Sequence, residues 1–217
     1  YDVKVYADLS ESRIKNELIS GLDRDQDAVY RARAAAAWEA GVDGIYSFNE
    51  FNMKRQYLRE IGVPEILKNA NNLYFVTYRN LNPNAYLKDG KNHLVLPVLS
   101  PDNQIPIGND PLDFMIEIGD EKNPANTFII LYVKDVKPEE LEVYINKSKA
   151  SFHKSTEDGL VIFKVTGNSV LPGMNSLSVK KSDVQSTGSK PTLLDVAILF
   201  HRNPDDAGLK ELSEVCF

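Results

Sequence analysis

The stretch Ala40–Phe51, AGVDGIYSFNEF, decides how the first part of this chain is expected to fold. Gly41 stands where a glycine commonly follows the last turn of a helix, because glycine adopts the left-handed conformation without strain. Residues 42–48 then read as a short strand with apolar side chains on both faces, a pattern typical of a parallel sheet. The strand runs into Asn49 and Glu50, so we expect polar groups at its carboxyl end.

The segments before this stretch predict a strand and then a helix. Residues 3–10 place apolar side chains on one face and polar ones on the other, the period of two that marks a strand. Asp25 or Asp27 can cap the helix that follows. That helix, Ala28–Ala40, carries four consecutive alanines, which let it lie close to a sheet. Trp38 is expected to pack between helix and sheet rather than to serve as an exposed platform for a ligand.

The segments after the stretch predict further helices. Met53–Ile61 reads as a helix closed by Gly62, and Pro64–Ala70 reads as a second, shorter one that begins with proline. Strand, helix, strand and helix in this order form a βαβα unit, which indicates an α/β class for the first part of the chain.

Short apolar runs separated by turn residues fill the range Lys91–Arg202. No convincing amphipathic helix lies between them, so we expect the strands of an antiparallel β-sandwich. The runs are HLVLPVL, LDFMIEI, TFIILYV, LEVYIN, GLVIFKV, NSLSVK and LLDVAILF. The asparagine-rich linker 79–85 marks the boundary, which predicts domains over 1–82 and 83–203 and a peripheral acidic tail over 204–217.

Composition argues against several classes of partner. A net charge of −6 and a pI near 5.2, without a cluster of Lys or Arg, give no electrostatic footprint for nucleic acid. The apolar runs are too short to span a membrane. Cys216 is the single cysteine, and the histidines His93, His153 and His201 lack the spacing of a metal pair. We therefore expect no metal and no cofactor.

Two stretches resemble a known family: YRARAAAAWEAGVDGIYSFN at 30–49 and YLREIG at 57–62. They are similar to the last helix-to-strand step of the (β/α)8 barrel in bacterial glycoside-hydrolase-like proteins, to which a β-sandwich is appended. The resemblance implies a fold of the class α/β plus all-β. The α/β part would be a partial TIM-type barrel that consists of its last βα units, and an antiparallel β-sandwich would follow it. A complete barrel needs about 250 residues. The chain would then be the C-terminal part of a longer protein, with the rest of the barrel as its partner.

The same resemblance implies a function. The parent would be a glycoside hydrolase that acts on poly- or oligosaccharide, and it would be secreted, periplasmic or on the cell surface. Glycosidases use two carboxyl groups, one as proton donor and the other as nucleophile or base. Many barrel glycosidases take the two from different strands, and one of these strands would be missing here. The chain by itself is therefore expected to be inactive.

Catalytic groups of a barrel lie at the carboxyl ends of its strands, which makes Glu50 and Asp8 the catalytic candidates. Each has a structural alternative, because Glu50 near a helix start is favoured by the helix dipole and Asp8 is suited to hold a loop. Asn49 is equally suited to cap the next helix. The expected substrate-binding residues are Asn49, Tyr6, Ser10 and Glu11.

The alternative function is a non-enzymatic module that binds carbohydrate or protein through its β-sandwich. LEVYIN at 141–146 and LPGMNSLSV at 171–179 resemble the turn rhythm of accessory sandwiches in glycosidases. Exposed aromatic side chains would be the usual sugar platform. Tyr132, Tyr144 and Phe163 lie within strand patterns and are expected to be packed instead.

Overall fold

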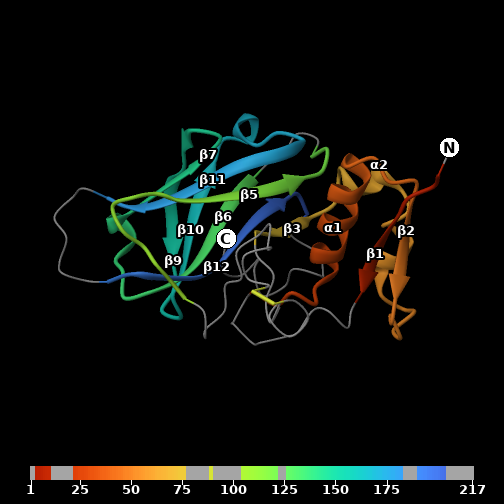
Figure 1. Cartoon of the computed structure of the whole chain (residues 1–217), viewed down its shortest axis with the longest axis horizontal. Coiled ribbons are helices and arrows are strands. Elements are labelled where there is room, and N and C mark those ends of the chain that lie inside the picture. The colour runs from red at the N-terminus through yellow and green to blue at the C-terminus, as the bar shows by residue number, and fades with distance from the viewer. Residues whose placement is uncertain are drawn as a thin grey trace.

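The computed structural model describes residues 3–10, 22–76, 88–89, 104–121, 126–182 and 190–203 (Figure 1). Two α-helices lie in these ranges, α1 (Asp27–Glu39) and the single turn α2 (Pro64–Leu67). Three short 3₁₀ helices are η2 (Gln56–Arg59), η5 (Pro138–Glu140) and η6 (Gly167–Ser169). The strands are β1 (Tyr6–Ser10), β2 (Gly44–Phe48), β3 (Asn72–Phe75), β4 (Ile105–Pro106), β5 (Leu112–Ile118), β6 (Asn126–Lys134), β7 (Leu141–Ile145), β8 (Ser148–Lys149), β9 (Ser151–Ser155), β10 (Leu160–Val165), β11 (Gly173–Lys181) and β12 (Thr192–His201).

Two antiparallel sheets form the larger part of the molecule. One has the order β3-β12-β6-β10-β9, with β4 also paired to β12, and the other has the order β5-β11-β7-β8. Side chains alternate along each strand, so one face of each sheet turns inward. These inward side chains pack into one hydrophobic cluster, which includes Ile129, Leu131, Phe163, Ile198, Phe114, Ile116, Val143 and Leu177.

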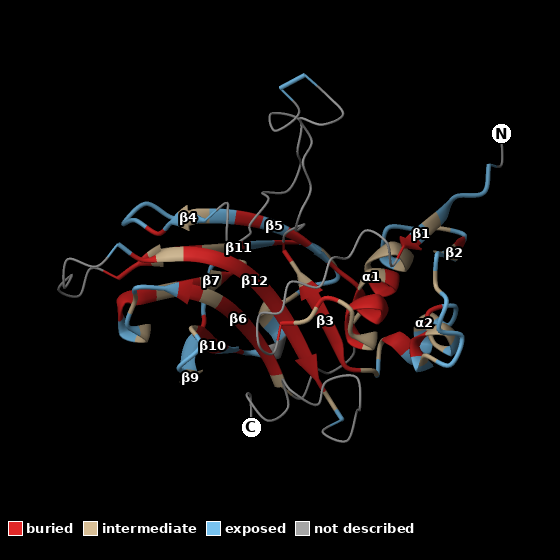
Figure 2. Ribbon diagram, turned by 90° about the horizontal axis from the view of Figure 1, so that it is seen from below, coloured by how far each residue is buried: buried red, intermediate tan, exposed pale blue. Residues whose placement is uncertain are grey.

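Strand β12 lies inside the six-stranded sheet, between β6 on one side and β3 and β4 on the other, and is buried over almost its whole length (Figure 2). Both of its faces are covered, because a second hydrophobic cluster packs on the other side of this sheet. Leu22, Ala28 and Val29, at and before the start of α1, contribute to that second cluster. The helix is thereby anchored on the sheet.

Helix α1 lies between the sandwich and a separate pair of strands, β1 and β2 (Figures 1 and 2). The two strands run parallel, with Tyr6 opposite Gly44 and Ser10 opposite Phe48. Leu9 and Ile45 point toward the helix and join the main cluster. The helix ends as predicted, because Gly41 follows it with a φ of +86°.

The structure overturns the partial TIM-type barrel expected for the first part of the chain. Strands make up 45% of the described residues and helices 17%, which does not fit a series of βα units. The parallel sheet contains two strands within the described ranges. The next strand, β3, instead pairs antiparallel with β12, so the chain leaves the parallel pattern after one βαβ step.

The helix expected over Met53–Ile61 is replaced by turns and the short η2. Side chains cause this: Glu50 accepts the backbone N–H of Asn52 at 2.7 Å, and Asn52 accepts that of Lys54 at 3.2 Å. Such local bonds compete with helical ones. The predicted N-cap of α1 was also wrong, since Gln26, and not Asp25 or Asp27, occupies that position.

The predicted division at residue 82 stays a prediction, although β3, which precedes it, belongs to the six-stranded sheet. The tail 204–217 and the run HLVLPVL lie outside the described residues. The other predicted runs coincide with β5, β6, β7, β10, β11 and β12 to within a few residues.

Candidate functional site

The outer face of the β1–β2 pair, turned away from α1, carries several sequence-predicted site residues. Side chains that are opposite each other in a parallel pair share a face, so Tyr6, Asp8, Tyr46 and Phe48 lie together. The aromatic side chains are open to solvent: Tyr6 is 64% exposed, Tyr46 55% and Phe48 46%. We call these three rings and Asp8 the aromatic face.

Gly44 shapes this face because it has no Cβ atom. A Cβ added at Gly44 would lie 2.6 Å from Cε1 and 2.7 Å from Cδ1 of Tyr6, far inside van der Waals contact. The Tyr6 ring therefore lies across the start of β2. The rings of Tyr46 and Phe48 follow along the same strand, with centroids 6.3 Å apart and planes tilted by 34°.

Asp8 sits among these rings, directly opposite Tyr46 and two residues beyond Tyr6. Its side chain is exposed and makes no hydrogen bond or ion pair within the described part of the chain. The nearby carboxylate of Asp43 differs, because it accepts the backbone N–H of Val5 at 2.8 Å and pairs with Lys4 at 3.1 Å. These bonds lower the pKa of Asp43.

Glu50, the other catalytic candidate, is held by its own loop. Its side chain is 3% exposed. One carboxylate oxygen accepts the backbone N–H of Asn52, the other accepts the hydroxyl of Tyr57, and Arg55 lies 3.9 Å away. Both oxygens are thus occupied by the protein. A catalytic role for Glu50 stays a prediction, and the visible role is to order residues 50–57.

A buried cluster that sequence reasoning missed supports this loop. The rings of Tyr30 and Tyr57 stack with centroids 4.3 Å apart, and the Arg55 guanidinium lies 4.7 Å and 4.8 Å from them. Arg55 also pairs with Asp25 and with Asp27, the latter at 2.9 Å. Burial pulls the pKa of Arg55 down, but the two aspartates raise it more. Burial and Glu50 raise the pKa of Tyr57.

The remaining predicted residues fall in different surroundings. Ser10 shares the register of the aromatic face but is only 1% exposed. Asn49 is exposed and has a φ of 59°, a conformation that asparagine tolerates better than most residues, so it ends β2 as a turn residue. Glu11 lies outside the described residues. Phe163 is buried, while Tyr132 and Tyr144 are half-buried.

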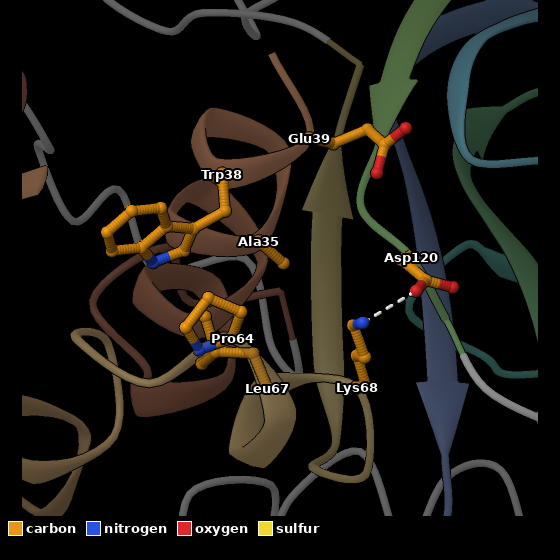
Figure 3. A pocket seen from close by; sticks show the side chains of 7 residues that line it. All are labelled: Ala35, Trp38, Glu39, Pro64, Leu67, Lys68 and Asp120. Atoms are coloured by element: carbon orange, nitrogen blue, oxygen red, sulfur yellow. Dashed lines mark ion pairs between the residues drawn. The ribbon is translucent and has the colours of Figure 1, made fainter. Parts of the chain in front are cut away.

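A small cavity of about 170 Å³ lies on the sandwich side of α1 (Figure 3). Ligand pockets usually measure about 300–1,000 Å³, so it is too small for most ligands. Trp38 lines it and donates its indole N–H to the carbonyl of Ile61 at 2.8 Å, as expected for a packing residue. The other lining residues are Ala35, Glu39, Pro64, Leu67, Lys68 and Asp120, and Lys68 pairs with Asp120 at 2.8 Å.

Two further kinds of site are absent from the described ranges. No three side chains of the metal-binding types His, Cys, Asp and Glu gather there in a way that could hold a metal ion. No helix in these ranges has the length and apolar character needed to cross a membrane.

Comparison with protein-family models and with curated proteins finds no match for this chain. Among solved structures, the chain is similar to a β-porphyranase of glycoside hydrolase family 86 from the human gut bacterium Bacteroides plebeius. The identity is 14% and the TM-score 0.36, over 47% of this chain and 19% of that enzyme. A likeness this weak establishes neither a shared fold nor a shared activity.

Proposed function

We propose that this chain binds a poly- or oligosaccharide on its aromatic face and contributes Asp8 to the site of a glycoside-hydrolase-like protein. One observation carries the proposal: Tyr6, Tyr46 and Phe48 are exposed around an unpaired carboxylate on one side of a two-stranded sheet. Exposed apolar groups of this kind mark interaction sites in soluble proteins.

The chemistry of this face suits a sugar. A pyranose has an apolar side formed by C–H groups, which packs against aromatic rings, and an edge of hydroxyl groups. Aromatic side chains supply a large contact area of defined shape. An ionised carboxylate accepts hydrogen bonds through both oxygens, so Asp8 can bind hydroxyl groups at the edge of a stacked ring.

The resemblance of residues 30–49 and 57–62 to glycoside-hydrolase-like proteins supports the enzymatic part of the proposal. Asp8 would be the nucleophile or base, and hydrolysis needs a second carboxyl group as proton donor. Glu50 is engaged by Tyr57 and Asn52, which leaves it poorly placed for that role. We therefore expect the chain to bind glycan without cleaving it.

Affinity electrophoresis against a panel of soluble polysaccharides tests the proposal. We expect retardation of the wild-type chain by at least one polysaccharide and loss of this retardation in the double variant Tyr6→Ala/Tyr46→Ala. Phe152→Ala is the matched control, because Phe152 is equally exposed but lies on β9, at the edge of the six-stranded sheet. Binding that survives the double variant, or no binding to the whole panel, would contradict the proposal.

A second candidate is binding of another protein, favoured by the edges of the β1–β2 pair. Parallel sheets are normally covered on both faces and contain more strands. In the described residues, β1 and β2 pair only with each other. Light scattering of the same variants separates the candidates: self-association of the wild-type chain that is lost in Tyr6→Ala/Tyr46→Ala, without glycan binding, would favour a protein partner.

A further inference from the structure

We infer that the aromatic face selects uncharged, hydroxyl-rich glycans and rejects glycans that carry sulfate or carboxylate groups. The inference rests on the proposed function and names the class of ligand for the same site. Its basis is the distribution of charge around Asp8.

Asp8 is the charged side chain on this face, and the described residues leave its charge unbalanced. The cations that flank the strands are already paired. Lys4, just before β1, lies 3.1 Å from Asp43, and Arg55, after β2, is held by Asp25 and Asp27. Lys54 is exposed, but it belongs to the loop after β2. An anionic ligand over the rings would therefore meet a carboxylate beside which the described residues place no unpaired cation.

The hydrogen-bonding capacity of Asp8 also favours an uncharged ligand. An ionised carboxylate has acceptors and no donor, so its ligand must supply donors. Sugar hydroxyls supply them, whereas sulfate esters and uronate groups present further acceptors and a like charge. The net charge of −6 adds a weaker repulsion that acts on approach.

The position of Asp8 makes this contact hard to avoid for a ligand on the rings. Neighbouring strands lie about 4.8 Å apart, so side chains opposite each other are in reach of one group. A sugar stacked on Tyr46 places its edge next to Asp8, which is its partner in register. A sugar stacked on Tyr6 meets Asp8 as the next side chain on the same strand and face.

The test compares one glycan in two forms: an uncharged polysaccharide that the chain binds, and the same polysaccharide after partial chemical sulfation. Affinities are measured at low and at high salt for the wild-type chain and for Asp8→Asn, which keeps the size of the side chain. We expect the wild-type chain to bind the uncharged form on the order of tenfold more tightly at low salt. In Asp8→Asn this preference should shrink, and the affinity for the sulfated form should rise.

The possible outcomes distinguish failure of this inference from failure of the proposed function. Equal or tighter binding of the sulfated form by the wild-type chain, or an unchanged preference in Asp8→Asn, would overturn this inference and leave the proposed function standing. Absence of binding to every uncharged and sulfated polysaccharide would overturn both. Circular dichroism establishes that Asp8→Asn is folded, which we expect because Asp8 has no partner in the described structure.

Discussion

The ring of Tyr6 lies across Gly44, so that any side chain at position 44 would occupy its place. We therefore predict that Gly44→Ala displaces the Tyr6 ring and weakens glycan binding several-fold. Tyr6 is free to turn into solvent, and the backbone at Gly44 suits an alanine, so the free energy of unfolding should change by less than about 1 kcal/mol. Affinity electrophoresis and urea unfolding measure the two effects.

Gly62→Ala is the control for this prediction. A Cβ at Gly62 would contact nothing within 4 Å, and its backbone is likewise compatible with alanine. We expect this variant to bind glycan like the wild-type chain. Equal binding by Gly44→Ala and Gly62→Ala would show that the position of the Tyr6 ring does not matter for binding.

Arg55 is predicted to stabilise the fold strongly. It pairs with Asp25 and Asp27 and lies against the rings of Tyr30 and Tyr57. Arg55→Met removes the cation from these two partly buried carboxylates, which within the described residues keep only the Tyr30 hydroxyl at 3.2 Å and the Tyr57 backbone N–H at 3.4 Å. We expect a loss of about 2–3 kcal/mol in the free energy of unfolding, measured in urea.

The matched control is Arg59→Met, because Arg59 is exposed and makes no side-chain hydrogen bond or ion pair within the described residues. Surface substitutions of this kind usually change the free energy of unfolding by less than about 0.5 kcal/mol. A similar loss in both variants would show that the Arg55 cluster adds nothing specific.

Glu142 is predicted to make stability fall in acid. Lys149 at 2.6 Å and Lys180 at 3.1 Å lower the pKa of this carboxyl to about 2. A lowered pKa stabilises the folded chain above the ordinary value of 4.5, and the contribution disappears as the pH falls from about 4.5 to about 2. The melting temperature of Glu142→Gln should lie below that of the wild-type chain at neutral pH and approach it in acid. A constant difference across this window would contradict the assignment.

Glu121 is predicted to make the stability fall as the pH rises, which is opposite to the effect of Glu142. It accepts hydrogen bonds from Asn72 at 2.8 Å, from Arg202 at 2.7 Å and from the Tyr74 hydroxyl. Burial raises its pKa, and Arg202 offsets only part of that effect. A raised pKa favours the folded chain when the group is protonated, and this contribution is lost as the pH rises through the folded-state value. The stability of the wild-type chain relative to Glu121→Gln should therefore fall with rising pH.

The parts of the fold that were predictable depend on short-range patterns. LDFMIEI alternates with a period of two and forms β5 with the same bounds, and Gly41 ends α1 because of its own backbone preference. The pairing of β3 with β12 was not predictable, since it joins residues more than a hundred positions apart. Local pattern does not distinguish a βαβ step that continues into a barrel from one that stops after two strands.

Some features of the candidate site were likewise predictable from the sequence, and others were not. The shared face of Tyr6 and Asp8 follows from the alternation of residues 3–10, and its exposure to solvent came only with the structure. Arg55 contacts Asp25 and Asp27 across about thirty positions, and no motif joins them. Asp25 and Asp27 were predicted only as helix caps, and Arg55 lay within a predicted helix without a role of its own, because the stacked tyrosines that enclose Arg55 are visible only in three dimensions.

The Glu50 carboxylate has either a structural or a catalytic role, and the variant Glu50→Gln distinguishes the two. Its oxygens accept hydrogen bonds from Tyr57 and from the backbone of Asn52, and an amide retains only one of these acceptors. We expect a loss of about 1–2 kcal/mol in the free energy of unfolding and unchanged glycan affinity at a temperature where the variant is fully folded. Asp8→Asn should show the reverse, with altered binding and little change in stability. If Glu50→Gln instead loses affinity while its stability is unchanged, then Glu50 contacts the glycan, and its side chain must leave the loop contacts that bury it here.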